Sequence, residues 1–203
     1  MTVVWVVVVV LVGVAVALMA AGLVEVYAQL EQVRTVLRLQ DQPTPVHLAT
    51  LGEAVEELVP EPPPLLRRVA EGPLYSVLVL SSSCAVCQVI GSGLGAALAA
   101  DERVGQENAG RAPASFHGGI VVLVSAGQES AAREFLARTK LPPDVVVVDP
   151  LGQYAKQLGI DQSPTVVSVI DERLRAAATL SSYRQLEIFC QRERGEIAYQ
   201  PAG

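Results

Sequence analysis

Two patterns of hydrophobic residues divide the chain. No charged residue occurs from Val3 to Val24, a run made mostly of Val, Ala and Leu. At about 1.5 Å of rise per residue, a helix over this run is long enough to cross the hydrocarbon core of a bilayer. Beyond Gly72, short β-branched runs alternate with stretches of helical periodicity, which is typical of an α/β domain. The pattern therefore predicts a single membrane-spanning helix followed by a globular domain.

The alternative for the N-terminal run is a cleaved signal peptide, because residues 17–20 loosely resemble a small-residue cleavage site. Signal peptides have a basic n-region and a shorter apolar stretch, and nothing basic precedes this run, so an uncleaved anchor is the favoured interpretation. Apolar residues recur at helical spacing beyond it and predict an amphipathic stalk up to residue 40: Val26, Leu30, Val33 and Leu37.

Residues 41–71 are interpreted as a proline-rich linker. More than half of the chain's 13 prolines lie between Asp41 and Pro73, including Pro62-Pro63-Pro64. Such density breaks regular structure, and only one short helix is expected, around Leu48 to Leu58. The predicted organisation is thus a membrane helix and stalk over 1–40, a linker over 41–71 and a folded domain over 72–198.

Within that domain the periodicity predicts five strands and four helices. The order of strands and helices indicates an α/β sheet covered by helices. The tight turn at Asp171-Glu172-Arg173 makes the last two strands an antiparallel hairpin, so the sheet should be mixed. The strands are expected over Tyr75–Leu80, Ile120–Val124, Val145–Val148, Thr165–Ile170 and Leu174–Thr179, and the helices over Cys84–Ala100, Gln128–Lys140, Leu151–Leu158 and Tyr183–Glu193.

Composition narrows the function classes. The net charge of −6 and the absence of a basic stripe with interleaved aromatics argue against nucleic-acid binding. With only His47 and His117 and a single Cys-x-x-Cys, the chain does not have the ligands of a structural zinc site, and no metal is predicted. Gly91 and Gly93 imitate a dinucleotide-binding fingerprint but lie inside a predicted helix instead of directly after a strand, so no cofactor is predicted either.

The chemistry-bearing motif is Cys84-Ala85-Val86-Cys87, where a predicted strand gives way to a helix. The unpaired N–H groups and positive dipole end of a helix favour a thiolate, which is the reactive form. Cys84 should therefore be the nucleophile. Three residues later on the same helical face, Cys87 can attack a mixed disulfide on Cys84 and close an internal disulfide. A redox-active Cys84–Cys87 pair is the prediction.

A second motif, Ser163-Pro164-Thr165, opens a later strand and is similar to the cis-proline loop of thioredoxins. Together with three other motifs, it makes the chain from Gly72 to near Ala198 resemble the TlpA/ResA-type membrane-tethered thioredoxins, and most closely the MauD-type proteins of methylamine dehydrogenase maturation. The three motifs are Ser83-Cys84-Ala85-Val86-Cys87-Gln88, Asp149-Pro150-Leu151-Gly152 and Leu158-Gly159-Ile160.

The resemblance implies a thioredoxin fold and a set of roles. Cys84 would react with the substrate disulfide, Cys87 would resolve, and Pro164 would sit opposite the pair in a cis peptide bond that turns the backbone of Ser163 toward substrate. The domain would be extracytoplasmic, anchored in the cell membrane, and would act on cysteines of exported proteins with electrons from a membrane partner. Arg34 and Arg38, flanking the membrane run, favour the opposite orientation under the positive-inside rule.

The chain departs from the family pattern at several positions. Ser83 stands where Trp is usual, Ala85-Val86 where Gly-Pro is usual, and the family's buried acid would fall at or near Leu78 in a strand without a carboxylate. Slow resolution by Cys87, or another base, is therefore expected.

Three functions stay open: a thiol-disulfide oxidoreductase, which is favoured, a redox-silent scaffold or assembly factor at the membrane, and a thiol peroxidase. The last is disfavoured because Ser81, Ser82 and Ser83 replace the Pro and Thr expected upstream of its cysteine. The lone Cys190, on a helix of apolar periodicity, is interpreted as buried and inert.

Overall fold

The computed structural model describes residue 19 and residues 42–71, 74–107 and 119–195. The predicted membrane helix and stalk over 1–40 lie outside these residues, apart from Met19. Within the described ranges, no helix combines the length and the apolar character needed to cross a bilayer. The chain divides into two compact units, 1–41 and 42–203, and the fold described below belongs to the second.

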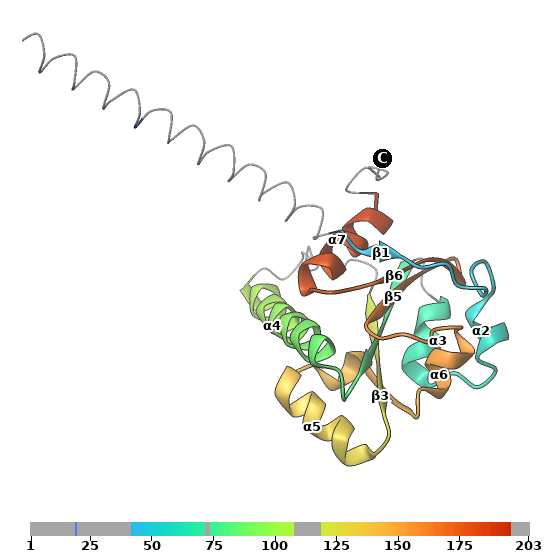
Figure 1. Ribbon diagram of the computed structural model, residues 1–203, viewed down its shortest axis with the longest axis horizontal. Coiled ribbons are helices and arrows are strands. Elements are labelled where there is room, and N and C mark those ends of the chain that lie inside the picture. Colours follow the sequence, from blue (N-terminus) through green and yellow to red (C-terminus); the bar gives the residue numbers. More distant parts are fainter. Residues whose placement is uncertain (1–18, 20–41, 72–73, 108–118, 196–203) are drawn as a thin grey trace, which may run out of the picture. The chain divides into compact units, whose positions relative to one another are not determined.

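A six-stranded mixed sheet forms the centre of this unit, in the order β1-β6-β5-β2-β3-β4 (Figure 1). Strands β2, β3 and β4 are parallel to one another. Strand β5 runs antiparallel to its neighbour β2, and β6 runs antiparallel to β5. The strands span Thr44–Pro45 (β1), Leu74–Ser81 (β2), Ile120–Ala126 (β3), Val146–Pro150 (β4), Thr165–Ile170 (β5) and Arg173–Thr179 (β6).

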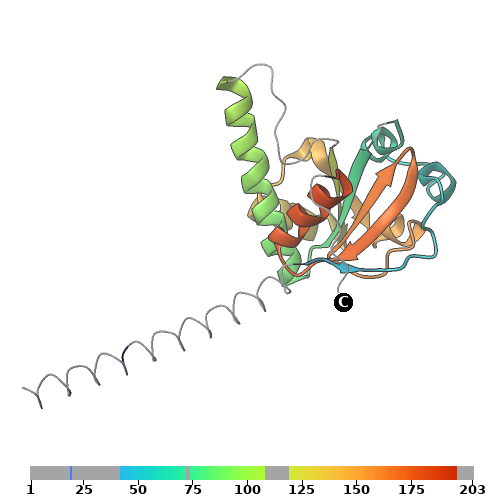
Figure 2. The same cartoon turned by 90° about the horizontal axis from the view of Figure 1, so that it is seen from above.

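Helices cover both faces of the sheet, as Figure 2 shows. Helices α4, α5 and α7 lie on one face and α2, α3 and α6 on the other. They span Val55–Leu58 (α2), Pro64–Glu71 (α3), Ala85–Glu107 (α4), Glu129–Thr139 (α5), Gln153–Gln157 (α6) and Tyr183–Glu193 (α7), with a short 3-10 turn at Pro143–Val145. The order β2-α4-β3 followed by the hairpin β5-β6 and α7 is that of a thioredoxin-like fold, which confirms the expected α/β thioredoxin-like fold of the domain with its mixed sheet.

Alternation along β2 explains why both faces need cover. Successive side chains in a strand point to opposite faces. Val77 and Val79 belong to the core under α2, α3 and α6, whereas Leu78 and Leu80 belong to the core under α4, α5 and α7. All four are at most 2% exposed. The central strand is thus apolar on both sides and must lie between two helical layers.

The hairpin predicted at Asp171-Glu172-Arg173 is present, with Ile170 paired to Arg173. Asp171 and Glu172 both have positive φ, 50° and 68°. Two left-handed residues in a two-residue connection are the pattern of a type I′ turn, whose twist matches that of the flanking strands.

The interpretation of residues 42–71 as a linker differs from the structure. Leu48, Val55, Val59 and Leu66 are at most 6% exposed and share a core cluster with the sheet. Two helices form here, α2 and α3, instead of one over 48–58. A high proline density does not exclude regular structure, because proline is compatible with the first position of a helix and with an edge strand. Here Pro64 begins α3, and Pro45 lies in β1 at the edge of the sheet.

Helix α4 carries the cysteine pair and packs closely on its neighbours through glycine. A Cβ built on Gly95 would lie 2.2 Å from the backbone oxygen of Thr139, at the end of α5. One built on Gly93 would lie 2.7 Å from the ring of Tyr183, on α7. A Cβ built on Gly91 would lie 2.9 Å from Cγ2 of Thr139, so Gly91 and Gly93 of the apparent dinucleotide fingerprint are helix-packing positions.

Candidate redox site

Cys84 stands at the N-cap position of α4. Its backbone oxygen accepts the hydrogen bond of the Gln88 N–H at 3.1 Å, which begins the helical ladder. Its Sγ accepts the N–H of Cys87 at 3.2 Å. This is the bond that a Ser or Asp oxygen makes at an N-cap, so the helix start presents an N–H and its positive dipole end to the sulfur.

The turn before Cys84 is held by the end of the sheet. Ser82 donates its N–H to the Ser125 oxygen of β3 at 2.9 Å, and Cys84 donates its N–H to the Ser81 oxygen at 3.2 Å. The hydroxyls of Ser81 and Ser83 lie 3.0 Å apart. Three serines therefore form the short connection from β2 to α4, and the hydrogen bonds above fix its backbone and two of its hydroxyls.

Cys87 differs from Cys84 in exposure. Cys84 is half-buried, whereas Cys87 is 0% exposed; both are free thiols. Burial, together with the hydrogen bond and the charge of Cys84, raises the pKa of Cys87 to about 12. The Ser81 backbone and the Ser163 side chain lower this pKa, but by less than burial raises it. At neutral pH Cys87 is a neutral thiol. The site thus has a half-buried sulfur at the start of the helix and a fully buried sulfur in its first turn.

The Ser163–Pro164 bond is cis, as the family resemblance implied. Pro164 is buried and its oxygen accepts the Leu180 N–H at 3.1 Å, while Thr165 Oγ1 donates to the Gln162 oxygen at 2.9 Å. The Ser163 side chain is half-buried, and its proximity lowers the pKa of the Cys87 thiol against the larger effect of burial. The structure thus brings together the two motifs that the sequence places almost 80 residues apart.

A pocket of about 190 Å³ adjoins this loop at the carboxyl ends of β2 and β3. It was not foreseen, because its walls come from separate segments with no shared motif. Its polar lining residues are Ser81, Ser125, Lys156, Asp161, Gln162 and Ser163, and its apolar ones include Val79, Leu151 and Ile160.

The carboxylate expected from the family is absent, as the sequence indicated. Leu78 is 0% exposed and belongs to the apolar core. Asp149 is the buried carboxylate among the described residues, and both its oxygens are engaged by the N–H groups of Tyr154 and Ala155 at 3.0 Å. Asp149 therefore caps α6 and does not act as a base for the thiols in this structure.

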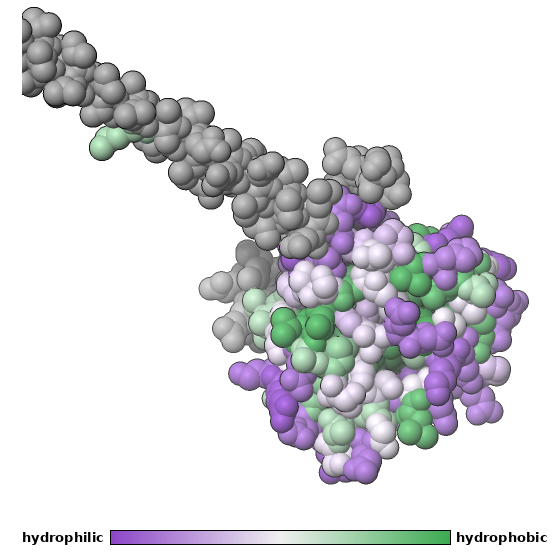
Figure 3. Space-filling view, in the orientation of Figure 1, coloured by the Kyte–Doolittle hydropathy of each residue, from purple (hydrophilic) through white to green (hydrophobic). Residues whose placement is uncertain are grey.

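The surface beside Cys84 is apolar. Val86 is 40% exposed and Val89 65% exposed on the outward side of α4. The outward side of α5 carries instead the ion pairs Arg133–Glu129 and Arg138–Glu134. Figure 3 shows the same contrast, with pale and green surface over α4 and purple surface over α5. An accessible thiol bordered by exposed valines suits contact with a polypeptide more than with a small charged molecule.

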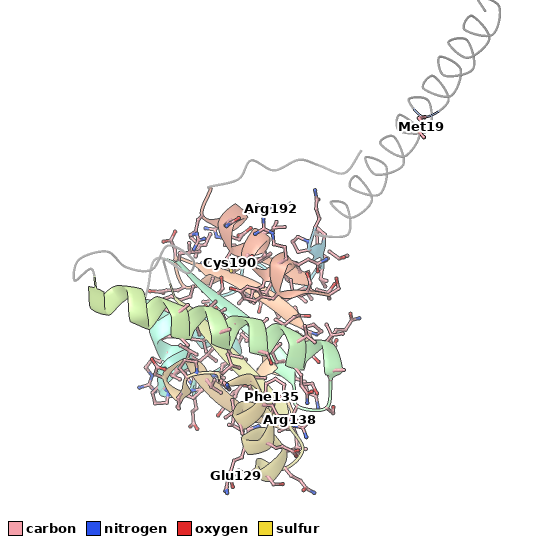
Figure 4. All side chains as sticks on the ribbon, turned by 90° about the vertical axis from the view of Figure 1, so that its left-hand side faces the viewer. Met19, Glu129, Phe135, Arg138, Cys190 and Arg192 are labelled. Carbon is pink, nitrogen blue, oxygen red and sulfur yellow. The ribbon has the colours of Figure 1, made fainter. Side chains whose placement is uncertain are left out.

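The other candidate residues lie elsewhere or outside the description. His117 falls within 108–118 and is outside the described residues. Cys190 is on α7; in Figure 4, α4 crosses the view between α7 with Cys190 and α5 with Phe135. Across the part of the chain that the structure describes, no group of three His, Cys, Asp or Glu residues could hold a metal ion.

No protein-family model matches the sequence, and no curated protein matches it. Solved structures of remote similarity include the MTB DsbF structure in mixed oxidized and reduced forms (14% identity, 71% of this chain and 95% of that one, TM-score 0.46). A secreted Mycobacterium tuberculosis disulfide oxidoreductase homologous to E. coli DsbE shares 13% identity over 61% of this chain and 82% of that one (TM-score 0.44). A DsbF homologue from Corynebacterium diphtheriae shares 16% sequence identity over 75% of this chain and 85% of that one (TM-score 0.44).

Proposed function

We propose that the protein is a thiol-disulfide oxidoreductase that uses Cys84 as nucleophile and Cys87 as resolving thiol. The observation that carries the proposal is the pairing of a half-buried N-cap sulfur with a fully buried thiol behind it, next to the cis Ser163–Pro164 loop. The similar solved structures named as disulfide oxidoreductases are consistent with this chemistry.

In the reducing direction the Cys84 thiolate attacks one sulfur of a client disulfide. The client S–S bond breaks, a Cys84–client disulfide forms, and the other client sulfur leaves as a thiolate that takes a proton from solvent. The Cys87 thiolate then attacks the Cys84 sulfur and releases the second client thiol. The client gains two electrons and the pair becomes a disulfide, so a dithiol protein must reduce it again. Oxidation of a client dithiol is the same sequence reversed.

The clients are proposed to be cysteine-containing exported proteins, which the apolar border of Val86 and Val89 would contact. By the sequence resemblance, the domain is further proposed to be extracytoplasmic and tethered to the cell membrane by the uncharged run over 3–24, close to a membrane dithiol donor, as in MauD-type proteins. Cell fractionation tests the tether, and labelling of Cys84 in intact cells by a membrane-impermeant maleimide tests the orientation.

The reduction potential of the Cys84/Cys87 pair tests the function itself. The full-length chain is equilibrated in thiol buffers of graded potential, and its redox state is read by alkylation. A potential near −270 mV or lower is expected for a disulfide reductase, and one above about −180 mV for an oxidant or isomerase. A pair that never exchanges would overturn the proposal in favour of a redox-silent scaffold.

A further inference from the structure

Leu151 combines two features that the packing of the fold does not explain. Its φ is 56°, in the left-handed region that a glycine or an asparagine adopts more easily than a bulky residue does. Its side chain is 64% exposed, so the unfavourable backbone conformation is not offset by burial. A large apolar side chain that is held outward in this way is typical of a residue that contacts a partner.

The turn that presents Leu151 is held at several points. The Leu151 N–H donates to the Ala126 oxygen at the end of β3 at 3.1 Å, and the Gly152 N–H donates to the Asp149 oxygen at 3.2 Å. The fully buried carboxylate of Asp149 accepts two backbone N–H groups of α6, each at 3.0 Å. Leu151 is therefore preorganised, which reduces the entropy that is lost when a partner binds to it.

Leu151 lies at the rim of the pocket of about 190 Å³. The floor of this pocket is apolar, because Val79, Ala155 and Ile160 are each at most 4% exposed. Its two charged lining residues are exposed and of opposite sign. A charged group placed against the apolar floor would lose its hydration without a partner of fixed sign. Small-molecule ligands occupy pockets of roughly 300 to 1,000 Å³, so this volume suits a single uncharged aliphatic side chain.

The pocket and the nucleophile share one turn of the chain. Ser81 lines the pocket, and its backbone oxygen accepts the Cys84 N–H at 3.2 Å. Ser163, next to the cis proline, lines the pocket as well. An extended polypeptide advances about 3.3 Å per residue. A client whose cysteine meets Cys84 can therefore place a side chain from within about three residues of that cysteine in the pocket.

A second hollow continues the pocket and gives the client chain a way onward. Its volume is about 520 Å³, and residues 46–49 form its far wall. The two hollows have in common the lining residues Lys156, Ile160, Asp161 and Gln162. A groove of this kind suits an extended polypeptide more than a compact ligand.

We propose that Leu151 and the pocket beside it bind an aliphatic side chain of the client, within about three residues of the client cysteine, and thereby select the disulfides that reach Cys84. The inference rests on the proposed function and adds a class of substrate to it. Leu151 acts as a specificity residue, because it contacts the client side chain and takes no part in the exchange of sulfur bonds.

Short peptides that contain one cysteine test the proposal. The cysteine is joined by a disulfide bond to thionitrobenzoate, and the three residues on each side of it are Leu in one peptide, Ser in a second and Asp in a third. The reduced full-length Cys190→Ala chain is the parent. Its Cys84 thiolate attacks the peptide sulfur, the bond between that sulfur and thionitrobenzoate breaks, and a Cys84–peptide disulfide forms. Thionitrobenzoate leaves as a coloured thiolate, and its initial release gives a rate constant for each peptide.

The preference of the parent is the ratio of its rate constants for the Leu and Asp peptides, and it should be roughly tenfold. Leu151→Asn should reduce this preference roughly fivefold, because it removes the apolar contact. It should not lower the thermal unfolding midpoint, since asparagine tolerates a positive φ. Ser125→Val, which fills the pocket from β3 and keeps Leu151, should reduce the preference as well.

Val148→Ala is the matched control. Val148 is an aliphatic residue of β4, 39% exposed and three positions before Leu151, and it does not line the pocket. This variant should keep the preference of the parent. Reaction with 5,5′-dithiobis(2-nitrobenzoate), which has no peptide part, reports the reactivity of Cys84 alone in every variant.

Four results would overturn the inference. They are equal rates of the three peptides in the parent, an unchanged preference in Leu151→Asn or in Ser125→Val, an equal loss of preference in Val148→Ala, and a lower unfolding midpoint of Leu151→Asn with equal slowing of every reagent. Failure of the proposed function looks different, because the parent itself would then release thionitrobenzoate from 5,5′-dithiobis(2-nitrobenzoate) no faster than an unfolded control peptide does.

Discussion

Cys87 and Cys190 are both buried thiols with a serine beside them, yet only one is placed to react. Burial raises the pKa of Cys87 to about 12 and that of Cys190 to about 11. The Ser76 hydroxyl lies 3.5 Å from the Cys190 sulfur, and the Ser163 side chain lowers the pKa of Cys87 against the effect of burial. The difference is the second thiol: Cys87 donates its N–H to the Cys84 sulfur at a helix start, whereas Cys190 lies within the last turns of α7 against the sheet. A buried thiol is therefore expected to react only when a second sulfur lies next to it, as Cys84 does beside Cys87.

The sharpest way to break this comparison is to remove the nucleophile. Cys84→Ser should abolish disulfide exchange, because the buried Cys87 cannot reach a client disulfide. The measurement is insulin or glutathione-disulfide reduction by the full-length chain, with Cys190→Ser as the matched control. Loss of activity in the Cys190 variant, with Cys84→Ser still active, would reverse the roles of the two regions.

The second largest effect is expected at Cys87. Cys87→Ser should leave the attack by Cys84 intact and trap a mixed disulfide, since no thiol remains to resolve it. The adduct is detected by non-reducing electrophoresis and mass spectrometry after reaction with a cysteine-containing peptide disulfide. Cys190→Ser should give no trapped species. Failure to trap an adduct under any redox condition would count against a resolving role for Cys87.

A pH series tests whether burial, the largest cause of the raised pKa of Cys87, keeps this thiol protonated in the mixed disulfide, where the hydrogen bond and the charge of Cys84 are lost. Only the ionised thiol attacks, and its fraction grows tenfold per pH unit below the pKa, so the resolving rate should rise about tenfold per unit from about pH 6 to 9. The measurement is the reaction of the reduced Cys190→Ala chain with 5,5′-dithiobis(2-nitrobenzoate), in which the second release of thionitrobenzoate, independent of reagent concentration, reports the resolving rate. A plateau near neutral pH would show that Cys87 ionises far below 12 in the mixed disulfide.

The smallest effect concerns Cys190 and stability. Because its folded pKa is raised from 9.0 to about 11, the folded form keeps the proton while the unfolded chain loses it. The stabilising contribution is complete below about pH 9 and is lost as the pH rises toward 11, by about 2 kcal/mol. Urea unfolding of the reduced protein should therefore show a smaller decline over this range in Cys190→Ala. An identical decline in the variant would contradict the predicted linkage.

Much of the fold followed from local pattern. The apolar run of β2, the helix α7 over 183–193 and the turn at Asp171-Glu172 could be predicted because each depends on residues close in sequence. Residues 42–71 were misread for the opposite reason. Their many prolines argued against helices, whereas α2 and α3 both form there, and only the sheet supplies the surface that buries Leu48, Val55 and Leu66.

The amino-acid sequence by itself determined that two thiols stand three residues apart where a strand ends and a helix begins, and that no carboxylate lies on the strand before them. Both are properties of neighbouring residues. Only the tertiary structure decided that Cys87 is buried in the core, that the loop with Ser163 and Pro164 comes next to the cysteine pair, and that a pocket with walls from four separate segments adjoins that loop. These depend on how distant segments pack, because burial and solvent access are properties of the assembled sheet and its helices.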